Sequence, residues 1–296
     1  IVVHGGAGVM SGLSEKAQQE IHNNIQETIS EAYAILEGGG SSLDAVEHAV
    51  SMLEDSPLFN AGRGSVYNSD EVQEMDASIM DGKNRLTGAI ASVSTIKNPI
   101  KLARKVAEET KHVLLVGEGA ERFAKDVGVE IVDKDYFHHE ERYQRVLNSK
   151  KQISKSMQSS DKIGTVGAVA LDRNGNIAAA TSTGGMTNKM PGRVGDSPII
   201  GSGTWAQNGV CGVSSTGHGE FFIKYQVARE VCVRIEYLNQ TLSDSAESII
   251  SELNALEAKG GLIAIDHMGK ISTPFNTKGM IRGSQTNKTE LKSYIY

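Results

Sequence analysis

A glycine followed by a threonine, at the head of an apolar run, is the most chemically suggestive feature of this sequence. Gly164 and Thr165 open a run that continues as Val166–Gly167–Ala168–Val169–Ala170–Leu171. If the bond between Gly164 and Thr165 were cut, Thr165 would carry a hydroxyl and a free α-amine. A threonine activated by its own amine is an established nucleophile for acyl transfer. The sequence therefore predicts a complete acyl-transfer centre at Thr165, with Gly164–Thr165 as the cleavage site.

The segments on either side of this junction have the composition that such chemistry needs. Residues 148–162 are rich in lysine and serine, contain no aromatic residue and predict a mobile linker. A processed junction needs such mobility, although an ordinary interdomain linker has the same composition. After the junction, residues 165–171 and 177–183 predict two strands joined by a tight turn. That hairpin would bring Thr183 next to Thr165.

Two later segments carry side chains and backbone groups that could bind a substrate. Arg193 and Asp196 lie three residues apart in a glycine-rich loop. An arginine can bind a carboxylate through parallel hydrogen bonds and an aspartate can accept an ammonium, so together they could hold a zwitterion. The alternative is that the two side chains pair with each other at the surface. Thr216 and Gly217 lie between a predicted strand and a predicted helix over 221–237, where hydroxyl and N–H groups suit an oxyanion.

Other features admit plainer interpretations. The turn over 5–8 could bring backbone N–H groups to a ligand or could simply end a strand. The turn at 117–119, after a predicted buried strand at 113–116, has the look of a dinucleotide site, but Arg122 stands where a third glycine is needed. We expect His48 to be a core or surface histidine on a packing helix rather than a catalytic one.

Composition and missing motifs exclude several classes of protein. The 296 residues carry a net charge of -6, which does not favour nucleic acid as a partner, and no apolar run is long enough to predict a membrane helix. The sequence has no Gly-x-Ser-x-Gly, His-Glu-x-x-His or Cys-x-x-Cys spacing, which argues against a hydrolase serine elbow and a catalytic transition metal. Two cysteines, without a secretory signal before the first strand, predict a reducing, cytoplasmic location and no disulfide.

Taken together, these motifs resemble one family closely. The chain is similar to the plant-type L-asparaginases, also called isoaspartyl peptidases, of the N-terminal nucleophile hydrolase superfamily. The resemblance runs nearly end to end and rests on six motifs in order: His4–Gly8, Pro57–Gly62, Gly164–Ala170, Thr181–Met186, Pro191–Asp196 and Thr216–Glu220.

The resemblance implies a fold and a maturation. The fold would be α+β, a four-layer αββα sandwich in which helices cover two stacked sheets, with residues 1–296 in a single domain. The precursor would cleave itself into an α subunit of residues 1–164 and a β subunit of residues 165–296. The two pieces would stay together and assemble as a dimer of heterodimers.

The resemblance also assigns the catalytic steps. Thr165 would attack the side-chain amide of asparagine, or the β-linked carbonyl of an isoaspartyl dipeptide, and form a covalent ester. Its α-amine would act as the base. Thr183 would orient the nucleophile, while the Thr216 hydroxyl and the Gly217 N–H would stabilise the oxyanion.

The substrate contacts follow from the same motifs. Arg193 would hold the α-carboxylate of the small-molecule substrate and Asp196 its α-ammonium, assisted by the backbone at Gly217 and Gly219. The resemblance implies no organic cofactor. It does imply an alkali cation, usually sodium, held by the backbone carbonyls of Leu53, Glu54, Ser56, Phe59, Ala61 and Arg63. A second cation loop, through which some members respond to potassium, would fall at 111–118.

Two rival functions stay open. A glycosylasparaginase would hydrolyse the amide link of N-acetylglucosaminyl-asparagine, but such relatives tend to have aspartate before the nucleophilic threonine, and Gly164 argues against that activity. An unprocessed, non-enzymatic relative that only dimerises is the other alternative. His218 stands where some relatives have threonine.

Overall fold

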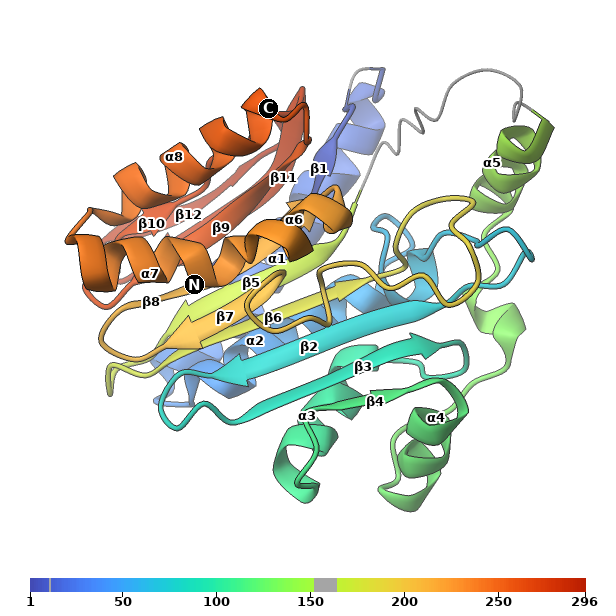
Figure 1. Ribbon diagram of the computed structural model, residues 1–296, viewed down its shortest axis with the longest axis horizontal. Helices are drawn as coiled ribbons and strands as arrows, with labels where there is room; N and C mark the ends of the chain where they lie inside the picture. The colour runs from blue at the N-terminus through green and yellow to red at the C-terminus, as the bar shows by residue number, and fades with distance from the viewer. Residues whose placement is uncertain (11, 152–163) are drawn as a thin grey trace.

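Two β-sheets, in which most neighbouring strands are antiparallel, form the framework of the molecule. The computed structural model describes residues 1–10, 12–151 and 164–296. The larger sheet has eight strands in the order β12-β11-β1-β5-β6-β2-β3-β4, and the smaller has four in the order β10-β9-β8-β7 (Figure 1). The strands are β1 (Val2–Gly8), β2 (Met75–Asp81), β3 (Thr87–Val93), β4 (Leu114–Val116), β5 (Val166–Leu171), β6 (Ile177–Thr183), β7 (Thr204–Gln207), β8 (Cys211–Gly217), β9 (Gly260–Asp266), β10 (Ile271–Ser272), β11 (Gly279–Thr286) and β12 (Thr289–Tyr294).

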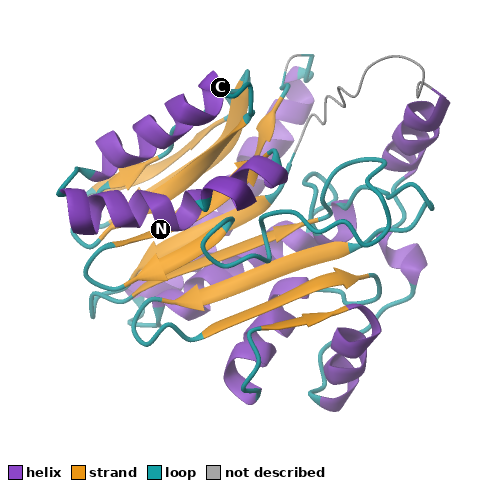
Figure 2. Ribbon diagram, viewed as in Figure 1, coloured by secondary structure: helices purple, strands orange, loops and turns teal. Residues whose placement is uncertain are grey.

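Helices pack on each sheet, and the sheets pack on each other. On the larger sheet, α1 contacts β11 and β12, α2 contacts β5 and β6, and α3 contacts β2 and β3. On the smaller sheet, α7 lies on β7 and β8, and α8 lies on β9 and β10 (Figure 2). Strands β1, β5 and β6 contact β8, and β1 and β5 also contact β9. The helices are α1 (Glu15–Glu37), α2 (Ser42–Asp55), α3 (Pro99–Glu109), α4 (Gly117–Asp126), α5 (Glu140–Lys151), α6 (Gly219–Tyr225), α7 (Val227–Leu238) and α8 (Leu242–Ala255), with short 3-10 turns η1 (Gly62–Gly64) and η2 (Lys134–Phe137).

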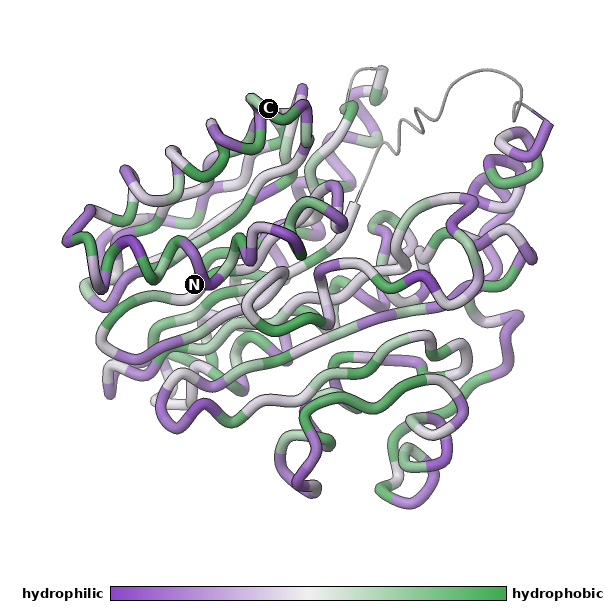
Figure 3. Tube along the Cα trace, viewed as in Figure 1, coloured by the Kyte–Doolittle hydropathy of each residue, from purple (hydrophilic) through white to green (hydrophobic). Residues whose placement is uncertain are grey.

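Alternation along the central strands divides the core into two parts. On β5, Val166, Ala168 and Ala170 join a cluster with α1, α2 and α3, whereas Val169 joins a second cluster with the smaller sheet, α7 and α8. Successive strand residues point to opposite faces, so one short strand serves both clusters. The helices show the matching pattern, since α8 alternates between hydrophobic and hydrophilic residues along its length (Figure 3).

The predicted elements are mostly present, with three differences. The helix expected over 221–237 is two helices, α6 and α7, separated at Gln226, whose φ of 50° is left-handed. The strand at 113–116 is not buried, because β4 is an edge strand with Val113 and Val116 more than half exposed. Strands β11 and β12 were not predicted, and they add two members to the larger sheet.

The structure contradicts the linker prediction over its first four residues. Residues 148–151 belong to α5, which continues to Lys151, so this part of the predicted linker is wrong. The lysines near its end are well placed, because cations favour the last turn of a helix. The remaining residues, 152–162, lie outside the described residues.

The prediction of two free thiols is also wrong. Cys211, at the start of β8, and Cys232, on α7, form a disulfide with their Cα atoms 5.6 Å apart. The packing of α7 across β8 brings these positions together, which spacing in sequence could not reveal. The argument for a reducing compartment loses this support, and the cytoplasmic location stays a prediction. No helix in the described part of the chain is both long and apolar enough to cross a membrane.

Candidate active site

The hydroxyls of two threonines meet at one end of the β5–β6 hairpin. Thr165 directly precedes β5, is 8% exposed, and donates a hydrogen bond to Thr183 Oγ1 at 3.0 Å. The backbone N–H of Gly185 donates to the same Thr183 oxygen at 3.0 Å. Antiparallel pairing places Val166 opposite Ser182, so the residues flanking this pair are neighbours. The two threonines predicted to lie side by side are therefore in contact.

Thr216 lies beside the glycine that precedes the nucleophile. A side-chain carbon at Gly164 would lie 3.2 Å from Thr216 Oγ1 and 3.4 Å from the carbonyl oxygen of Ala7. The Ala7 N–H donates to Thr216 Oγ1 at 3.3 Å. Gly6, with a φ of +104°, lies against the same residue, since a side-chain carbon there would be 2.6 Å from Gly164 Cα. Because Gly164 and Thr165 are joined here, this is the geometry of the uncut chain.

A buried, uncharged histidine lies next to the nucleophile. His4 is fully buried, and burial lowers its pKa to about 3 while the neighbouring Thr165 backbone acts in the opposite, weaker direction. Its imidazole is therefore neutral at physiological pH, and it contacts Ser214 Oγ through Nε2 at 3.0 Å. The assignment of the base to the α-amine that a cut before Thr165 would release stays a prediction.

Charged groups are concentrated at the predicted substrate anchor. A side-chain carbon at Gly219 would lie 2.9 Å from Arg193 Nη2 and 3.0 Å from Asp196 Oδ1, so the guanidinium and the carboxylate face the same point. Only a glycine leaves that space open. Arg193 forms its ion pair with Glu220, through Nε and Nη2 to Oε1 at 2.9 Å, rather than with Asp196. The alternative of a surface pair between Arg193 and Asp196 is therefore wrong.

Asp196 is a buried carboxyl with an unpaired oxygen, as expected of a side chain that binds a cationic group. It is 4% exposed, and its Oδ2 has no hydrogen-bond partner among the described residues. Burial raises its pKa to about 7. An unpaired buried carboxyl is costly unless a partner arrives, and an ammonium group would both pair with it and restore its charge.

The site also contains residues that sequence reasoning missed. Asn60 donates from Nδ2 to the Gly185 carbonyl at 2.7 Å and so supports the turn that holds Thr183. Lys189 is 5% exposed and donates to the Glu74 carbonyl at 2.8 Å. A side-chain carbon at Gly185 would be 2.9 Å from Lys189 Nζ. The amide and lysine in these loops were available signals, but their partners are more than 100 residues away in sequence.

The loop assigned to an alkali cation folds back onto its own carbonyls. A side-chain carbon at Gly64 would lie 2.8 Å from the Pro57 carbonyl oxygen and would press on that of Phe59. A side chain at Gly62 would press on the Glu54 carbonyl, and the Ala61 carbonyl accepts the Gly64 N–H at 3.1 Å with a second lone pair to spare. Carbonyl oxygens are ligands that hard cations take. The residues assigned to the cation lie close together in the chain, with Leu53 and Glu54 near the end of α2, Ser56 as its C-cap, and Phe59, Ala61 and Arg63 in the following loop and η1. Ligation of an alkali cation by these carbonyls stays a prediction.

The carboxyl of Glu54 links this loop to the strand that carries Thr183. It accepts from Ser182 Oγ at 2.6 Å and from the Ile100 N–H at 3.0 Å through one oxygen. Burial raises its pKa to about 8. The loop after α2 and β6 are therefore connected by a side chain that is protonated at neutral pH.

Elsewhere, the plainer interpretations hold. His48 Nε2 contacts Glu31 Oε2 at 2.9 Å on an exposed helix face, as expected for a surface histidine. The turn after β4 begins α4 with Gly117 and Gly119 open on their side-chain sides, without a built phosphate pocket. Within residues 1–10, 12–151 and 164–296, no group of three or more His, Cys, Asp or Glu side chains could hold a metal ion.

Comparison with known proteins agrees with this geometry. The chain is 46% identical over 292 residues to the isoaspartyl peptidase of Escherichia coli strain K12, covering 95% of this chain and 91% of the relative. It is 46% identical over 273 residues to the isoaspartyl peptidase/L-asparaginase of Rattus norvegicus, covering 91% and 80%. The human isoaspartyl peptidase/L-asparaginase is 44% identical over 273 residues, covering 91% and 87%. The family profile described as asparaginase matches residues 1–295, so the chain belongs to the asparaginase family.

Proposed function

We propose that this protein is a threonine-nucleophile hydrolase that converts L-asparagine to L-aspartate and ammonia and cleaves isoaspartyl dipeptides. The observation that carries the proposal is the buried Thr165–Thr183 hydrogen bond at a Gly–Thr junction beside Thr216. The names of the bacterial and mammalian relatives support the two substrate classes. The anchor at Arg193 and Asp196 gives the substrate its orientation.

Activation begins with the Gly164–Thr165 bond. The Thr165 hydroxyl adds to the Gly164 carbonyl, the C–N bond breaks, and the acyl group passes from nitrogen to oxygen as an ester. Water hydrolyses the ester, leaving a carboxylate on Gly164 and a free amine and hydroxyl on Thr165. The Thr216 hydroxyl, next to Gly164, is placed to stabilise the tetrahedral intermediate.

Turnover repeats the chemistry on a substrate. The Thr165 amine accepts the hydroxyl proton as Oγ1 attacks the amide carbon, while Thr183 fixes the direction of that hydroxyl. Thr216 Oγ1 and the Gly217 N–H bind the oxyanion. Ammonia, or the amino acid of a dipeptide, leaves with a proton, and water cleaves the β-aspartyl ester on Thr165. Reference values of about 7.7 to 8.0 for an α-amine make this base suitable near neutral pH.

The remaining parts of the proposal concern architecture and ligands. The contacts among helices and sheets favour the four-layer αββα sandwich, in one domain cut into residues 1–164 and 165–296. The two pieces would pair into a dimer of heterodimers in the cytoplasm, without nucleic-acid or membrane partners. A sodium ion, or potassium, would be held by the carbonyls of the loop after α2 and would stiffen it. No organic cofactor takes part.

Mass spectrometry of the purified protein tests the proposal. We expect two fragments, one of which begins with Thr165, and ammonia release from asparagine together with turnover of β-aspartyl-leucine. Thr165→Ala should give one uncut chain without either activity, and Thr165→Ser is the matched control that keeps a hydroxyl. A wild-type protein that remains uncut and inactive would support the non-enzymatic alternative. Preferential hydrolysis of N-acetylglucosaminyl-asparagine would support the glycosylasparaginase.

A further inference from the structure

A chain of buried hydroxyls joins the two sheets next to the proposed site. Ser78, Thr204, Thr181, Ser214 and His4, here called the hydroxyl relay, are each 0% exposed. Ser78 Oγ lies 2.6 Å from the Ser197 carbonyl oxygen and 2.8 Å from Thr204 Oγ1. Thr204 Oγ1 lies 2.6 Å from Thr181 Oγ1, Thr181 Oγ1 lies 2.7 Å from Ser214 Oγ, and Ser214 Oγ lies 3.0 Å from His4 Nε2.

The strand register explains why these residues meet. Ser78 is paired with Thr181, Thr181 with Gly167, and Gly167 with His4, so the four form one row across the larger sheet. On the smaller sheet, Thr204 is paired with Ser214. The relay therefore consists of two rows that face each other between the sheets.

Gly167 makes room for this arrangement. A side-chain carbon at that position would lie 2.5 Å from His4 Nε2 and would collide with Ser214 Oγ. The glycine two residues after the nucleophile thus has a function in the space between the sheets, since any side chain there would separate Ser214 from His4.

The relay is the polar link between the strands that carry the proposed catalytic groups. Thr181 lies two residues before Thr183 on β6, and Ser214 lies two residues before Thr216 on β8. Residues two apart on a strand share a face, so the Thr181–Ser214 hydrogen bond runs parallel to the gap between Thr183 and Thr216. The spacing of the nucleophile, held by Thr183, from the oxyanion donor depends on how this bond fixes the two sheets.

The supply of protons gives the relay a direction. Ser78 Oγ shares its one proton between the Ser197 carbonyl and Thr204 Oγ1, and Thr204 Oγ1 donates to Thr181 Oγ1. Each hydroxyl has one proton to donate, so the later links are both bonded only if Thr181 donates to Ser214 and Ser214 donates to His4 Nε2. A neutral imidazole whose Nε2 accepts carries its proton on Nδ1, which agrees with the Thr165 backbone hydrogen bond that raises the pKa of His4.

We propose that the hydroxyl relay is a positioning network for the reaction, in which Thr181 and Ser214 hold the nucleophile and the oxyanion donor at their working separation and His4 is fixed as its Nδ1–H tautomer. The inference rests on the proposed function, since it needs Thr165 as the nucleophile. Misplacement of reacting groups by 1 Å can lower a rate by about 10²-fold, so the relay acts on kcat rather than on substrate binding.

A pair of substitutions at Thr181 separates the hydroxyl from its packing. Thr181→Val keeps the shape and removes the hydroxyl, and Thr181→Ser keeps the hydroxyl and removes a methyl. For fully cleaved protein we expect Thr181→Val to lower kcat by about 10- to 100-fold with KM within about threefold of wild type, and Thr181→Ser to keep kcat within about twofold. Equal kcat in Thr181→Val and wild type, or equal losses in both variants, would overturn the proposal.

Two further measurements distinguish a relay from separate contacts. The double variant Ser214→Ala/Thr181→Val should lower kcat no more than the worse of the two single variants, because either change alone already interrupts the hydroxyl relay. Losses in kcat that multiply fully in the double variant would contradict the relay. Ser215→Ala is the matched control, since Ser215 is buried on the same strand with no hydroxyl partner among the described residues, and it should leave kcat unchanged.

Nitrogen NMR of the histidines tests the direction directly. In the wild-type protein we expect the His4 signal of a neutral ring protonated at Nδ1 between pH 5 and 8, and a mixture of tautomers in Thr181→Val. A ring protonated at Nε2 in the wild type would overturn the relay. These outcomes differ from failure of the proposed function, which would leave the wild-type chain itself uncut and without turnover.

Discussion

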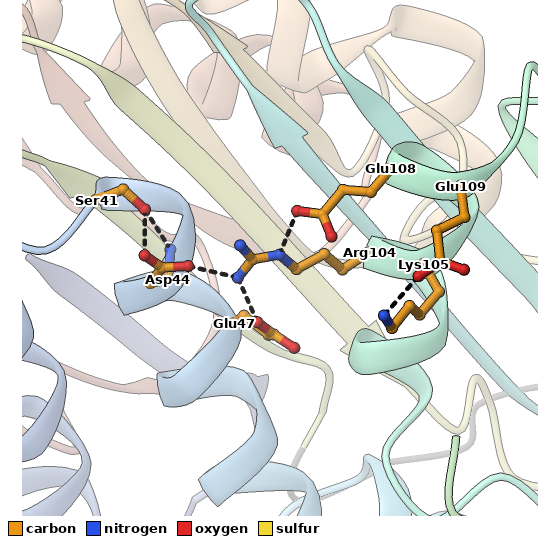
Figure 4. A network of polar contacts seen from close by, with 7 residues as sticks. All are labelled: Ser41, Asp44, Glu47, Arg104, Lys105, Glu108 and Glu109. Carbon is orange, nitrogen blue, oxygen red and sulfur yellow. Dashed lines mark hydrogen bonds and ion pairs between the residues drawn. The ribbon is translucent and has the colours of Figure 1, made fainter. Parts of the chain in front are cut away.

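Polar groups hold two regions of this molecule together in opposite ways. Between the sheets, the hydroxyl relay is uncharged and wholly buried. On the helix layer, Arg104 of α3 contacts Asp44 at 2.7 Å, Glu47 at 2.5 Å and Glu108 at 2.8 Å (Figure 4). These carboxylates keep between a fifth and a half of their side-chain surface in water. The first region contains no charge, and the second is built from charges.

The difference follows from the cost of removing polar groups from water. A buried charge without a partner is expensive, whereas a hydroxyl is tolerated in the interior when its hydrogen bonds are made. Charges at the surface stay partly hydrated, so each ion pair contributes little to the free energy of unfolding, and its loss is offset by water. The comparison indicates that single interior hydroxyls should matter more to this protein than whole surface ion pairs.

The largest expected effect is at Thr216, which is 1% exposed and lies beside Gly164, the residue before the proposed cleavage site. Thr216→Val should lower kcat by about 10² to 10³, because an oxyanion donor typically contributes about 2.7 to 4 kcal/mol to the transition state. Steady-state ammonia release measures this, with Thr216→Ser as the control that retains the donor. An unchanged kcat in the valine variant would remove Thr216 from the oxyanion site.

The disulfide between β8 and α7 extends the comparison to a covalent link. In the uncut Thr165→Ala chain, Cys211→Ala with Cys232→Ala should lower the free energy of unfolding by about 3 kcal/mol, because the bond closes a loop with a sequence separation of 21. Guanidinium unfolding of the two chains gives the difference. If wild-type protein is equally stable with and without a reductant, the link does not constrain the unfolded chain.

Arg193 shares one property with each region. It is charged, as the Arg104 network is, and it is largely buried, as the relay is, because its side chain is only 16% exposed. Arg193→Met should raise KM for asparagine by about 10²-fold while leaving chain cleavage intact, because truncating a charged binding partner costs about 2 to 5 kcal/mol. Kinetics on the fully cleaved variant test this. A variant that fails to cleave but binds substrate normally would contradict the assignment of Arg193 to the substrate carboxylate.

Asp196 should make substrate binding depend on pH. Its pKa of about 7 means that the carboxyl is mostly neutral at pH 6, so KM should fall about tenfold between pH 6 and 8. The free energy of unfolding should change with pH in the opposite direction. Because the pKa of Asp196 is raised in the folded state, the unfolded state loses this proton at a lower pH, so the contribution of Asp196 to stability falls as pH rises from about 4 to about 7. KM in Asp196→Asn should be high and independent of pH over the same range; a wild-type pH profile in that variant would exclude Asp196 as the cause.

The smallest effect belongs to the charged network of Figure 4. Arg104→Met should reduce the free energy of unfolding by no more than about 1 kcal/mol and should leave kcat unchanged. The loss should shrink further in high salt, because salt screens partly exposed charges. A loss larger than that of the Cys211–Cys232 bond would reverse the comparison drawn above.

The local parts of this picture could be read from the sequence. The Thr165–Thr183 contact follows from a hairpin of two short strands, and α1 and α2 follow from apolar stripes that begin at Ser14 and Ser41 caps. Local patterns suffice where the partners are close in the chain. The break at Gln226 is local too, but nothing in its neighbours marks a left-handed residue there.

The long-range parts could not be predicted. The relay joins residues from five strands, and its hydrogen bond between Ser214 and His4 spans 210 positions. The Cys211–Cys232 bond depends on how α7 crosses β8, and the exposure of β4 depends on its place at the edge of the sheet. Each of these facts requires the order of strands, which composition and periodicity do not contain.

That order has a consequence for a chain cut at Gly164–Thr165. Strand β1, from the N-terminal piece, lies between β11 and β5 of the C-terminal piece, and β2 lies beside β6, so three ladders of the larger sheet join the two pieces. The two pieces would share one sheet, and separating them would break the β11–β1, β1–β5 and β6–β2 ladders together. If the two pieces were synthesised separately, each would expose unpaired strand edges, which favour aggregation. Folding of the uncut precursor before cleavage avoids this exposure.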